Sequence, residues 1–451
     1  MRSLADFRLY QVQALDFCRA TPRAYLAAKP GAGKTAVALA LMADLLLDSF
    51  EIRRALVVAP KRVVPQWAKE ARRWAFGRDL AFSEYIGPAD ARKRALAART
   101  HVVVVSFEFF TELVQACGKT WPFDLVVFDE ASRLRQGGRQ GSVSWKAMNA
   151  ISAKTSSRIL LMSGSPRPGT AHELFAPVFL LDQGQRLGKT VTGFRLAYLE
   201  PHKQNRYTGQ VYSWRLRAGM EAQLYGRIKD LYFAVSPDLG LPYVEIDRVL
   251  ALPAVVEAVC EQLQRDQVVD VDELELMAGS MATVAGKLHQ IAGGAVFQDD
   301  GTVVELHDEK LDDLAALIDE LDGEPLIVCY WYSHELERLK RRFPEAVELA
   351  QVEGLARTLA GGVQMALLHP ASAGHGIDGL QQHFSALAWF ALPNSFELYD
   401  QANKRIVRSG QRETVRVFRL LAGIDHKITA RLAEKEAEQE QFFAYLENST
   451  A

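Results

Sequence analysis

Short apolar runs alternate with amphipathic stretches along the first third of the chain. The runs are mostly Val, Ile and Leu without strict apolar–polar alternation, and they lie at 24–28, 55–59, 101–106, 125–128 and 159–162. Strands buried on both faces of a parallel sheet have this pattern. Segments such as 36–47 and 64–74, between the runs, carry the apolar spacing of helices. The order predicts repeated βαβ units and therefore an α/β fold with a doubly wound parallel sheet.

A second set of the same kind begins near residue 311. Helical patterns at 311–321 and 334–343 alternate with strand-like runs at 326–330, 363–368, 386–390 and 415–421. The middle of the chain has few strand-like runs and several prolines, and the tail at 430–447 has a helical composition. We therefore expect an N-terminal α/β lobe at 1–183, a mostly helical insert at 184–304, and a C-terminal α/β lobe with a helical tail at 305–451.

The composition is that of an ordinary globular protein. Of 451 residues, 49% are hydrophobic and 24% are charged, and the formal net charge is −2, so any surface for nucleic acid must be local. The four cysteines are scattered without C-x-x-C spacing, which argues against a zinc site and a disulfide framework. The longest apolar run is too short to span a bilayer, and the first residues lack a signal-peptide pattern. We expect a cytoplasmic protein with no membrane partner.

The segment AKPGAGKT, residues 28–35, follows a predicted strand and precedes a predicted helix. In that setting backbone N–H groups at the helix N-terminus can bind phosphates, the Lys34 side chain can reach the β- and γ-phosphates, and the Thr35 hydroxyl can ligand Mg²⁺. Ala28 stands where a first glycine is usual, but the two later glycines keep the turn. The sequence thus predicts a site for ATP and Mg²⁺, with contacts from Pro30, Gly31, Ala32, Gly33, Lys34 and Thr35.

Two acids end the apolar strand predicted at 125–128. Carboxylates at the C-terminal end of a parallel strand face the ligand crevice. Asp129 can hold Mg²⁺ through water, and Glu130 can polarise the attacking water as a general base. Another run, LLMSGSP at 160–166, ends in small hydroxyl residues and glycine, and it could sense the γ-phosphate.

The second lobe supplies a Gly-rich segment, HPASAGHGIDGL at 369–380, directly after a predicted strand. Its backbone allows close approach of a phosphate, from ATP or from a nucleic acid, and Gly376 and Asp378 are the candidate contacts.

The segment QANKRIVRSGQ at 401–411 offers two arginines. On a continuous helix, Arg405 and Arg408 lie three residues apart on one face, and Gln401 precedes them on that face. Arginine suits phosphate because its planar fork donates two hydrogen bonds and stays charged. Together with the phosphate loop, the pair suggests a motor that hydrolyses ATP between two lobes and converts closure into movement.

Taken in order, these motifs resemble those of the Swi/Snf-type ATPases of helicase superfamily 2, most closely the compact bacteriophage-encoded members. LYQ at 9–11 resembles the adenine-reading glutamine motif, AKPGAGKT motif I, DEAS motif II, SGSP motif III, SAGHGIDGLQ motif V and QANKRIVRSGQ motif VI. The resemblance runs from residue 7 to about 421. It implies two RecA-like lobes, ATP hydrolysis with Mg²⁺, adenine contact by Gln11, and catalytic roles for Lys34, Asp129, Glu130, Gln401, Arg405 and Arg408.

Besides Ala28, four residues depart from the family pattern, and one of them is Arg135, which stands where the family often has lysine. Ser132 replaces the usual histidine of motif II, which affects the coupling of hydrolysis to motif III rather than the chemistry. Asp378 replaces a common asparagine in motif V and adds negative charge near a phosphate. Lys404 replaces a usual acid in motif VI.

Basic and aromatic residues are interleaved between 186 and 217. The basic residues are Arg186, Lys189, Arg195, Lys203, Arg206, Arg215 and Arg217, and the aromatic ones are Phe194, Tyr198, Tyr207, Tyr212 and Trp214. Two interpretations stay open: a surface that tracks phosphates and stacks bases, or a helical element whose aromatic residues are core.

The leading hypothesis is an ATP-dependent, nucleic-acid-stimulated motor that translocates on or remodels DNA, with duplex favoured over single-stranded or branched DNA. One alternative is a true strand-separating DNA or RNA helicase. Another is a non-hydrolysing switch that closes on DNA with ATP bound. No nuclease pattern is visible in the sequence, so any cleavage requires a partner nuclease, and a replication protein is a second candidate partner.

Overall fold

The computed structural model describes residues 1–29, 31–135, 142–154, 158–164, 171–204, 208–236, 243–271, 274–278, 280–373, 379–408 and 410–447. Three predicted site residues, Pro30, Gly376 and Asp378, lie outside these ranges. The chain divides into two compact units, one made of Met1–Pro237 with Ala437–Ala451 and the other of Asp238–Glu436. The predicted insert at 184–304 is therefore shared between the two units.

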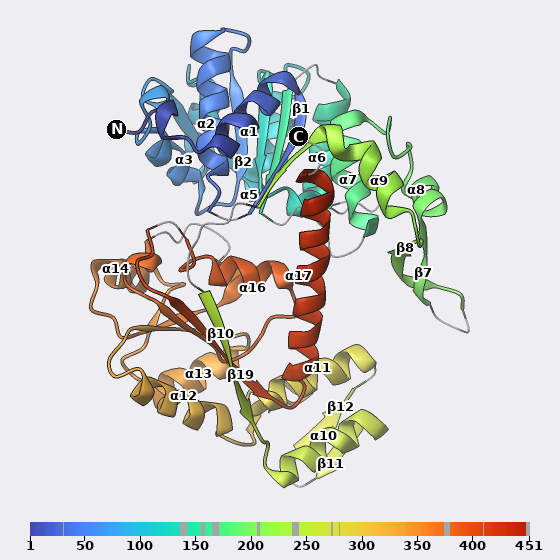
Figure 1. Ribbon diagram of the computed structural model, residues 1–451, viewed down its shortest axis with the longest axis vertical. Coiled ribbons are helices and arrows are strands. Elements are labelled where there is room, and N and C mark those ends of the chain that lie inside the picture. Colours follow the sequence, from blue (N-terminus) through green and yellow to red (C-terminus); the bar gives the residue numbers. More distant parts are fainter. Residues whose placement is uncertain are drawn as a thin grey trace. The chain divides into compact units, whose positions relative to one another are not determined.

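The first unit is built on a seven-stranded parallel sheet (Figure 1) with the order β3-β4-β2-β5-β6-β1-β9. Its strands are β1 (Arg23–Ala28), β2 (Ala55–Ala59), β3 (Phe82–Tyr85), β4 (Val102–Ser106), β5 (Leu125–Asp129), β6 (Arg158–Ser163) and β9 (Tyr232–Val235). Both faces are buried: Leu56 and Val58 lie in one core, and Val57 between them lies in the other. Burial on both faces explains the continuous apolar runs. The predicted doubly wound parallel sheet is confirmed.

Helices cover both faces of this sheet. The face that carries Val57 packs against α1 (Leu9–Ala20), α2 (Lys34–Ala43), its π-helical continuation η2 (Asp44–Asp48) and α3 (Val64–Ala71). The opposite face packs against α5 (Phe107–Cys117), α6 (Val143–Lys154), α7 (Phe175–Asp182), α8 (Val191–Tyr198) and α9 (Glu221–Ile228). The remaining elements of this unit are α4 (Ala89–Ala97), η1 (Leu4–Asp6), η3 (Ala75–Gly77), η4 (Ala131–Leu134), η5 (Ala171–Leu174), η6 (Lys229–Leu231), β7 (Leu199–Gln204) and β8 (Val211–Leu216).

The last helix, α17 (Asp425–Glu447), contributes its final turns to the core of the first unit. Phe442 is buried there, with its ring edge-on to Tyr225 at a centroid distance of 5.1 Å. The Lys29 ammonium, in the predicted phosphate-binding segment at 28–35, lies 5.8 Å from the ring centroid of Phe443. Residues of the last helix therefore complete the core of the unit that contains the N-terminal part of the chain.

The second unit holds a six-stranded parallel sheet with the order β10-β19-β18-β15-β17-β16. Its strands are β10 (Tyr243–Leu250), β15 (Leu326–Cys329), β16 (Val347–Glu348), β17 (Met365–Leu368), β18 (Ala386–Trp389) and β19 (Val415–Ala422). Its helices are α10 (Ala254–Asp266), α11 (Met281–Ala292), α12 (Glu309–Glu320), α13 (Ser333–Arg342), α14 (Val352–Ala360), α15 (Pro370–Ala373), η7 (Leu380–Gln382), α16 (Phe396–Asn403) and the first half of α17, up to Glu436. No helix in the described ranges is long and apolar enough to cross a membrane.

The segment at 184–304 is more mixed than the mostly helical insert we expected. Besides α8 to α11 it contains the edge strands β9 and β10, the hairpin β7–β8, the hairpin of β11 (Val268–Val271) and β12 (Leu274–Met277), and β13 (Ala295–Phe297), which pairs with β14 (Val303–Glu305). An edge strand is harder to recognise in a sequence, because one of its two sides has no partner strand and faces solvent. In β10, the charged residues Glu245, Asp247 and Arg248 interrupt the apolar run.

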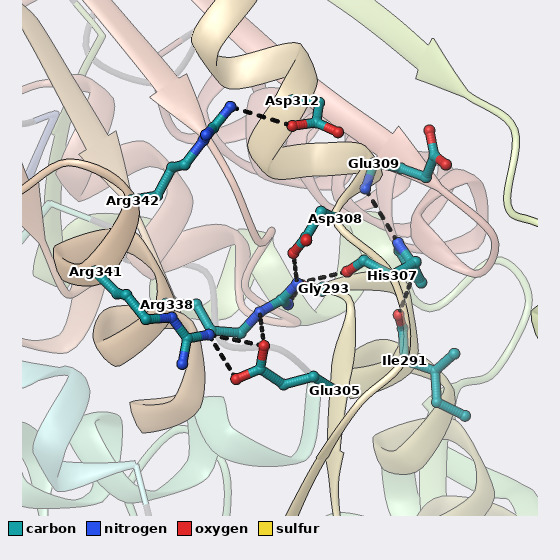
Figure 2. A network of polar contacts seen from close by, with 10 residues as sticks. All are labelled: Ile291, Gly293, Glu305, His307, Asp308, Glu309, Asp312, Arg338, Arg341 and Arg342. Atoms are coloured by element: carbon teal, nitrogen blue, oxygen red, sulfur yellow. Dashed lines mark hydrogen bonds and ion pairs between the residues drawn. The ribbon is translucent and has the colours of Figure 1, made fainter.

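A buried arginine connects the segment at 184–304 to helix α13 of the second unit by hydrogen bonds (Figure 2). The Arg338 guanidinium on α13 donates to the backbone oxygens of Gly293 (2.7 Å) and His307 (2.5 Å) and to the Asp308 carboxylate (2.6 Å). Gly294 has φ +95°, and a Cβ there would lie 2.4 Å from an Arg338 nitrogen. A glycine is therefore needed for the arginine to approach so closely.

Candidate functional site

The predicted phosphate loop connects β1 to α2 through two glycines in the left-handed region. Gly31 has φ +85° and Gly33 has φ +84°, a conformation that other residues adopt only at a cost. Gly33 is the N-cap of α2, and its C=O accepts the N–H of Val37 at 3.2 Å. The sequence therefore places a helix N-terminus directly after the turn, where backbone N–H groups are available for an anion.

Lys34 and Thr35 are the first two residues of α2. The Lys34 ammonium donates to the C=O of Ala28, at the end of β1, with an Nζ–O distance of 2.6 Å. Both side chains are partly exposed. Lys34 therefore lies across the loop, from the helix start to the strand end, as a lysine that reaches bound phosphates requires.

Gln11 lies against this loop. Its side chain is buried, its Nε2 donates to the C=O of Ala32 at 3.2 Å, and its Oε1 accepts the N–H of Arg8 at 2.9 Å. A Cβ on Gly33 would lie 2.2 Å from Gln11 Nε2. The loop and the first helix are thus fitted to each other, and the glycine leaves the room that Gln11 occupies.

The acids of motif II stand beside the loop in the same sheet, because β5, β6 and β1 are neighbours. Asp129 ends β5, and Glu130 follows it with φ +74°. The Ser163 hydroxyl, at the end of β6, donates to Glu130 Oε1 at 2.9 Å. A non-glycine residue with positive φ needs support from its surroundings, and this hydrogen bond supplies some of it.

Ser163 was predicted only as a member of the segment at 160–166, which could sense the γ-phosphate, and no contact to Glu130 was expected. It is fully buried, so its bond to Glu130 connects motif III to motif II through the interior of the sheet. Ser132, which departs from the usual histidine, lies in the short helix η4 directly after Glu130. The Ser163 contact gives this chain a direct link between the two motifs that does not involve residue 132.

The carboxyl group of Asp129 is held in an unusual electrostatic setting. Burial and the neighbouring Glu130 carboxylate raise its pKa to about 7, and the Lys34 ammonium opposes that shift. A divalent cation would restore the charged form, and Mg²⁺ prefers oxygen ligands such as a carboxylate and a hydroxyl. Asp129 and Thr35 therefore fit the metal role that the sequence predicted for them.

In the second unit, α16 ends earlier than the helix we predicted for motif VI. The helix stops at Asn403, so Gln401 lies on it while Arg405 and Arg408 lie in the turn that follows. The single helix face predicted for these three residues is wrong. Beyond Asn403 the backbone includes i→i−3 hydrogen bonds, such as Arg405 N–H to Ala402 C=O at 3.0 Å. Both arginines are partly exposed.

The basic and aromatic stretch divides between the two interpretations left open. Phe194 and Tyr198 are core residues, as the structural interpretation requires. Arg186 pairs with Asp182 and Asp230 and Arg215 with Glu200, so two of its cations are neutralised by acids. Arg206 and Tyr207 lie outside the described residues.

Comparisons with known proteins bear on these motifs. Residues 10–232 match the SNF2-related domain. Protein p41 of Acyrthosiphon pisum secondary endosymbiont phage 1 is 30% identical over 454 residues, covering 96% of this chain and 97% of that protein. The chain belongs to the SNF2-related family. The predicted resemblance to Swi/Snf-type ATPases is confirmed, and this SNF2-related protein is an ATP hydrolase of helicase superfamily 2.

Two further likenesses are more limited. The DNA repair and recombination protein RAD54 of Oryza sativa subsp. japonica is 29% identical over 187 residues, which is 39% of this chain and 18% of that protein. The Sulfolobus solfataricus SWI2/SNF2 ATPase core in complex with dsDNA aligns over 97% of this chain and 92% of its own, with 18% identity and a TM-score of 0.44. The SNF2-related chain thus spans less than a fifth of the rice protein.

Proposed function

We propose that this SNF2-related ATPase is a motor that acts on DNA, and that it translocates along intact duplex. The observation that carries the proposal is the arrangement of loop and acids on neighbouring strands, with Lys34 at the start of α2 and Glu130 bonded to Ser163. That arrangement suits repeated hydrolysis rather than a single binding event. The rice relative is named for DNA repair and recombination, which favours DNA as the track.

The roles within the nucleotide site follow from chemistry and position. The Lys34 ammonium and the loop Pro30–Thr35 hold the phosphates, and Gln11 contacts the adenine. A Mg²⁺ ion, held by Thr35 and by Asp129 through water, neutralises charge on the phosphates. Glu130 takes the proton of the attacking water, and Ser163 holds the carboxylate that does so.

The second unit supplies the remaining charges. Arg405 and Arg408 reach the γ-phosphate in cis when the two units close, and Gln401 orients the attacking water beside them. Gly376 and Asp378 let backbone approach a phosphate of ATP or of the DNA. We propose the same three-part organisation as the sequence suggested: an ATP-binding lobe at 1–183, a segment for DNA contact at 184–304, and a helicase lobe at 305–451.

The proposed setting is the cytoplasm of a host cell, since the full-length relative is phage-encoded. Translocation along duplex requires contacts to backbone phosphates rather than base reading. A partner nuclease or replication protein would supply any further chemistry on the DNA.

The test compares DNA substrates. We expect duplex DNA to stimulate ATP turnover at least as well as single strands, branched DNA or RNA, with little sequence preference. A triplex-forming strand should be displaced from duplex when ATP is hydrolysed, while forked duplexes stay annealed. Efficient fork unwinding with stimulation by single strands alone would favour the strand-separating helicase. ATP binding without measurable turnover on any substrate would favour the switch.

A further inference from the structure

A polar cluster in the second unit surrounds the end of α16. Tyr399 and Asn403 lie four residues apart on the last turns of this helix and therefore share a face. The Tyr399 hydroxyl donates to Glu245 Oε1 on strand β10 at 2.6 Å. The Asn403 Nδ2 donates to the Tyr243 hydroxyl at 3.3 Å, and that hydroxyl donates to the same Glu245 oxygen at 2.5 Å. One oxygen of Glu245 thus accepts a hydrogen bond from Tyr399 directly and one from Tyr243, to which Asn403 is bonded.

The other side of the helix end is fixed by the core. The indole N–H of Trp389, at the end of β18, donates to Asn403 Oδ1 at 3.0 Å. The rings of Trp389 and Tyr399 are stacked with a centroid distance of 5.0 Å. Asn403 and Tyr399 are buried, so neither can exchange these partners freely for water.

The turn that carries Arg405 and Arg408 is hydrogen-bonded to the backbone of Asn403. The Asn403 C=O accepts the N–H groups of Ile406 at 3.1 Å and Val407 at 3.0 Å. Ile406 and Val407 are themselves buried, whereas Arg405 and Arg408, on either side of them, are partly exposed. A shift or rotation of Asn403 would therefore move the backbone from which both arginines project.

The second oxygen of the Glu245 carboxylate is hydrogen-bonded as well. Arg419 on β19 donates to Glu245 Oε2 at 2.6 Å and to Asp247 Oδ1 at 2.5 Å. The cavity beside the cluster has a volume of about 40 Å³ and is lined by residues that include Phe396, Lys404 and Glu436. It has room for a few water molecules only, so the cluster is not a nucleotide site.

We infer that Glu245, acting through Tyr399 and Asn403, is a positioning residue that sets where Arg405 and Arg408 stand for phosphate transfer. The inference rests on the proposed role of those arginines. Catalysis is sensitive to small displacements of a charged group, because transition-state stabilisation depends on fixed geometry.

The test uses two variants and a matched control. Glu245→Gln removes the charge but keeps the shape, and Tyr399→Phe removes one hydroxyl while leaving the Glu245–Arg419 pair and the ring stack in place. Asp247→Asn is the control, because Asp247 lies on the same strand and shares Arg419 but has no described bond to α16. DNA-stimulated kcat, KM for ATP and melting temperature are measured for each.

We expect both test variants to lower kcat by about ten- to a hundredfold with KM for ATP changed by less than about threefold, because displaced groups cost rates of this order. The control should stay within about twofold of the unaltered protein. In a background that carries both Arg405→Ala and Arg408→Ala, Glu245→Gln should add less than about twofold, because both groups that it positions are already gone.

Three outcomes would overturn the inference: an unchanged kcat in Glu245→Gln and Tyr399→Phe, an equal loss in Asp247→Asn, or losses that multiply in the background that lacks both arginines. Failure of the proposed function looks different. There Arg408→Ala alone would leave stimulated turnover unchanged, whatever the Glu245 variants do.

Discussion

The hydrogen bond from Ser163 to Glu130 makes a quantitative prediction. Ser163→Ala removes the hydroxyl that donates to the Glu130 carboxylate at 2.9 Å and leaves every charged group in place. A hydrogen bond to a charged group is worth about 1.5–3 kcal/mol. If that free energy holds Glu130 in its reactive position, turnover falls by about 10- to 150-fold at about 1.4 kcal/mol per factor of ten.

The expected loss is confined to the chemical step. Ser163 lies behind Glu130 rather than in the phosphate loop, so the affinity for ATP should change by less than about threefold. Single-turnover hydrolysis at saturating duplex DNA measures the step, and binding of a fluorescent ATP analogue measures the affinity.

Ser106 provides a matched control. It ends strand β4 of the same sheet, is fully buried like Ser163, and its hydroxyl has no hydrogen-bond partner in the described structure. Ser106→Ala should leave turnover unchanged and cost no stability, because it removes an unsatisfied buried group. The reasoning is refuted if Ser163→Ala hydrolyses ATP within about twofold of the unaltered rate, or if both variants lose the same amount.

Four other outcomes follow from the same structure. Lys34→Ala should weaken both ATP binding and turnover. Glu130→Gln should bind ATP and leave it unhydrolysed. Near-normal turnover of Glu130→Gln on DNA would show that Glu130 is not the general base. Arg408→Ala should lower stimulated turnover by about 10³–10⁵ with modest effect on affinity, as measured by phosphate release. Because the pKa of Asp129 is about 7, the affinity for Mg²⁺ should increase about tenfold for each unit by which the pH is raised toward 7, and it should level off above pH 7. An affinity for Mg²⁺ that does not change between pH 5.5 and 7 would contradict this. Phe442→Ala should cost about 3–5 kcal/mol of unfolding free energy in the first unit, measured by denaturant titration, and a cost below about 1 kcal/mol would show that the end of α17 is dispensable.

The central strands of both sheets were predictable because they are buried on both faces. Strand β2 was placed at 55–59 with both ends correct, and β5 and β15 to within one residue. The edge strands β3 and β10 were missed, because solvated or charged positions interrupt their apolar pattern. The edge strand β9 was also missed, although Tyr232, Phe233 and Ala234 are buried. The pattern of apolar residues indicates burial, and β3 and β10 have too few buried positions to show such a pattern.

The nucleotide loop was predictable for a different reason: its residues act through local backbone geometry. Gly31 and Gly33 adopt the left-handed conformation that the motif implies, and Lys34 begins the helix. The end of α16 was not predictable. Nothing local in the residues after Asn403 requires a stop. The bonds that hold Asn403 come from Trp389 on the preceding strand and from Tyr243, which is 160 residues away in the sequence. The bond between Ser163 and Glu130 is long-range in the same way.

The burial of Phe442 in the first unit has a consequence for how the protein is made. Tyr225, its ring partner, leaves the ribosome about 220 residues before Phe442 does. At about 5–20 residues per second, that gap lasts roughly 10–40 s. Throughout it the nucleotide-binding sheet has one apolar flank uncovered, and this flank is where we expect a nascent chain to need a chaperone. Ribosomes that stop early would release chains with a complete phosphate loop and an incomplete core. ATP hydrolysis should therefore appear only once synthesis of α17 is finished.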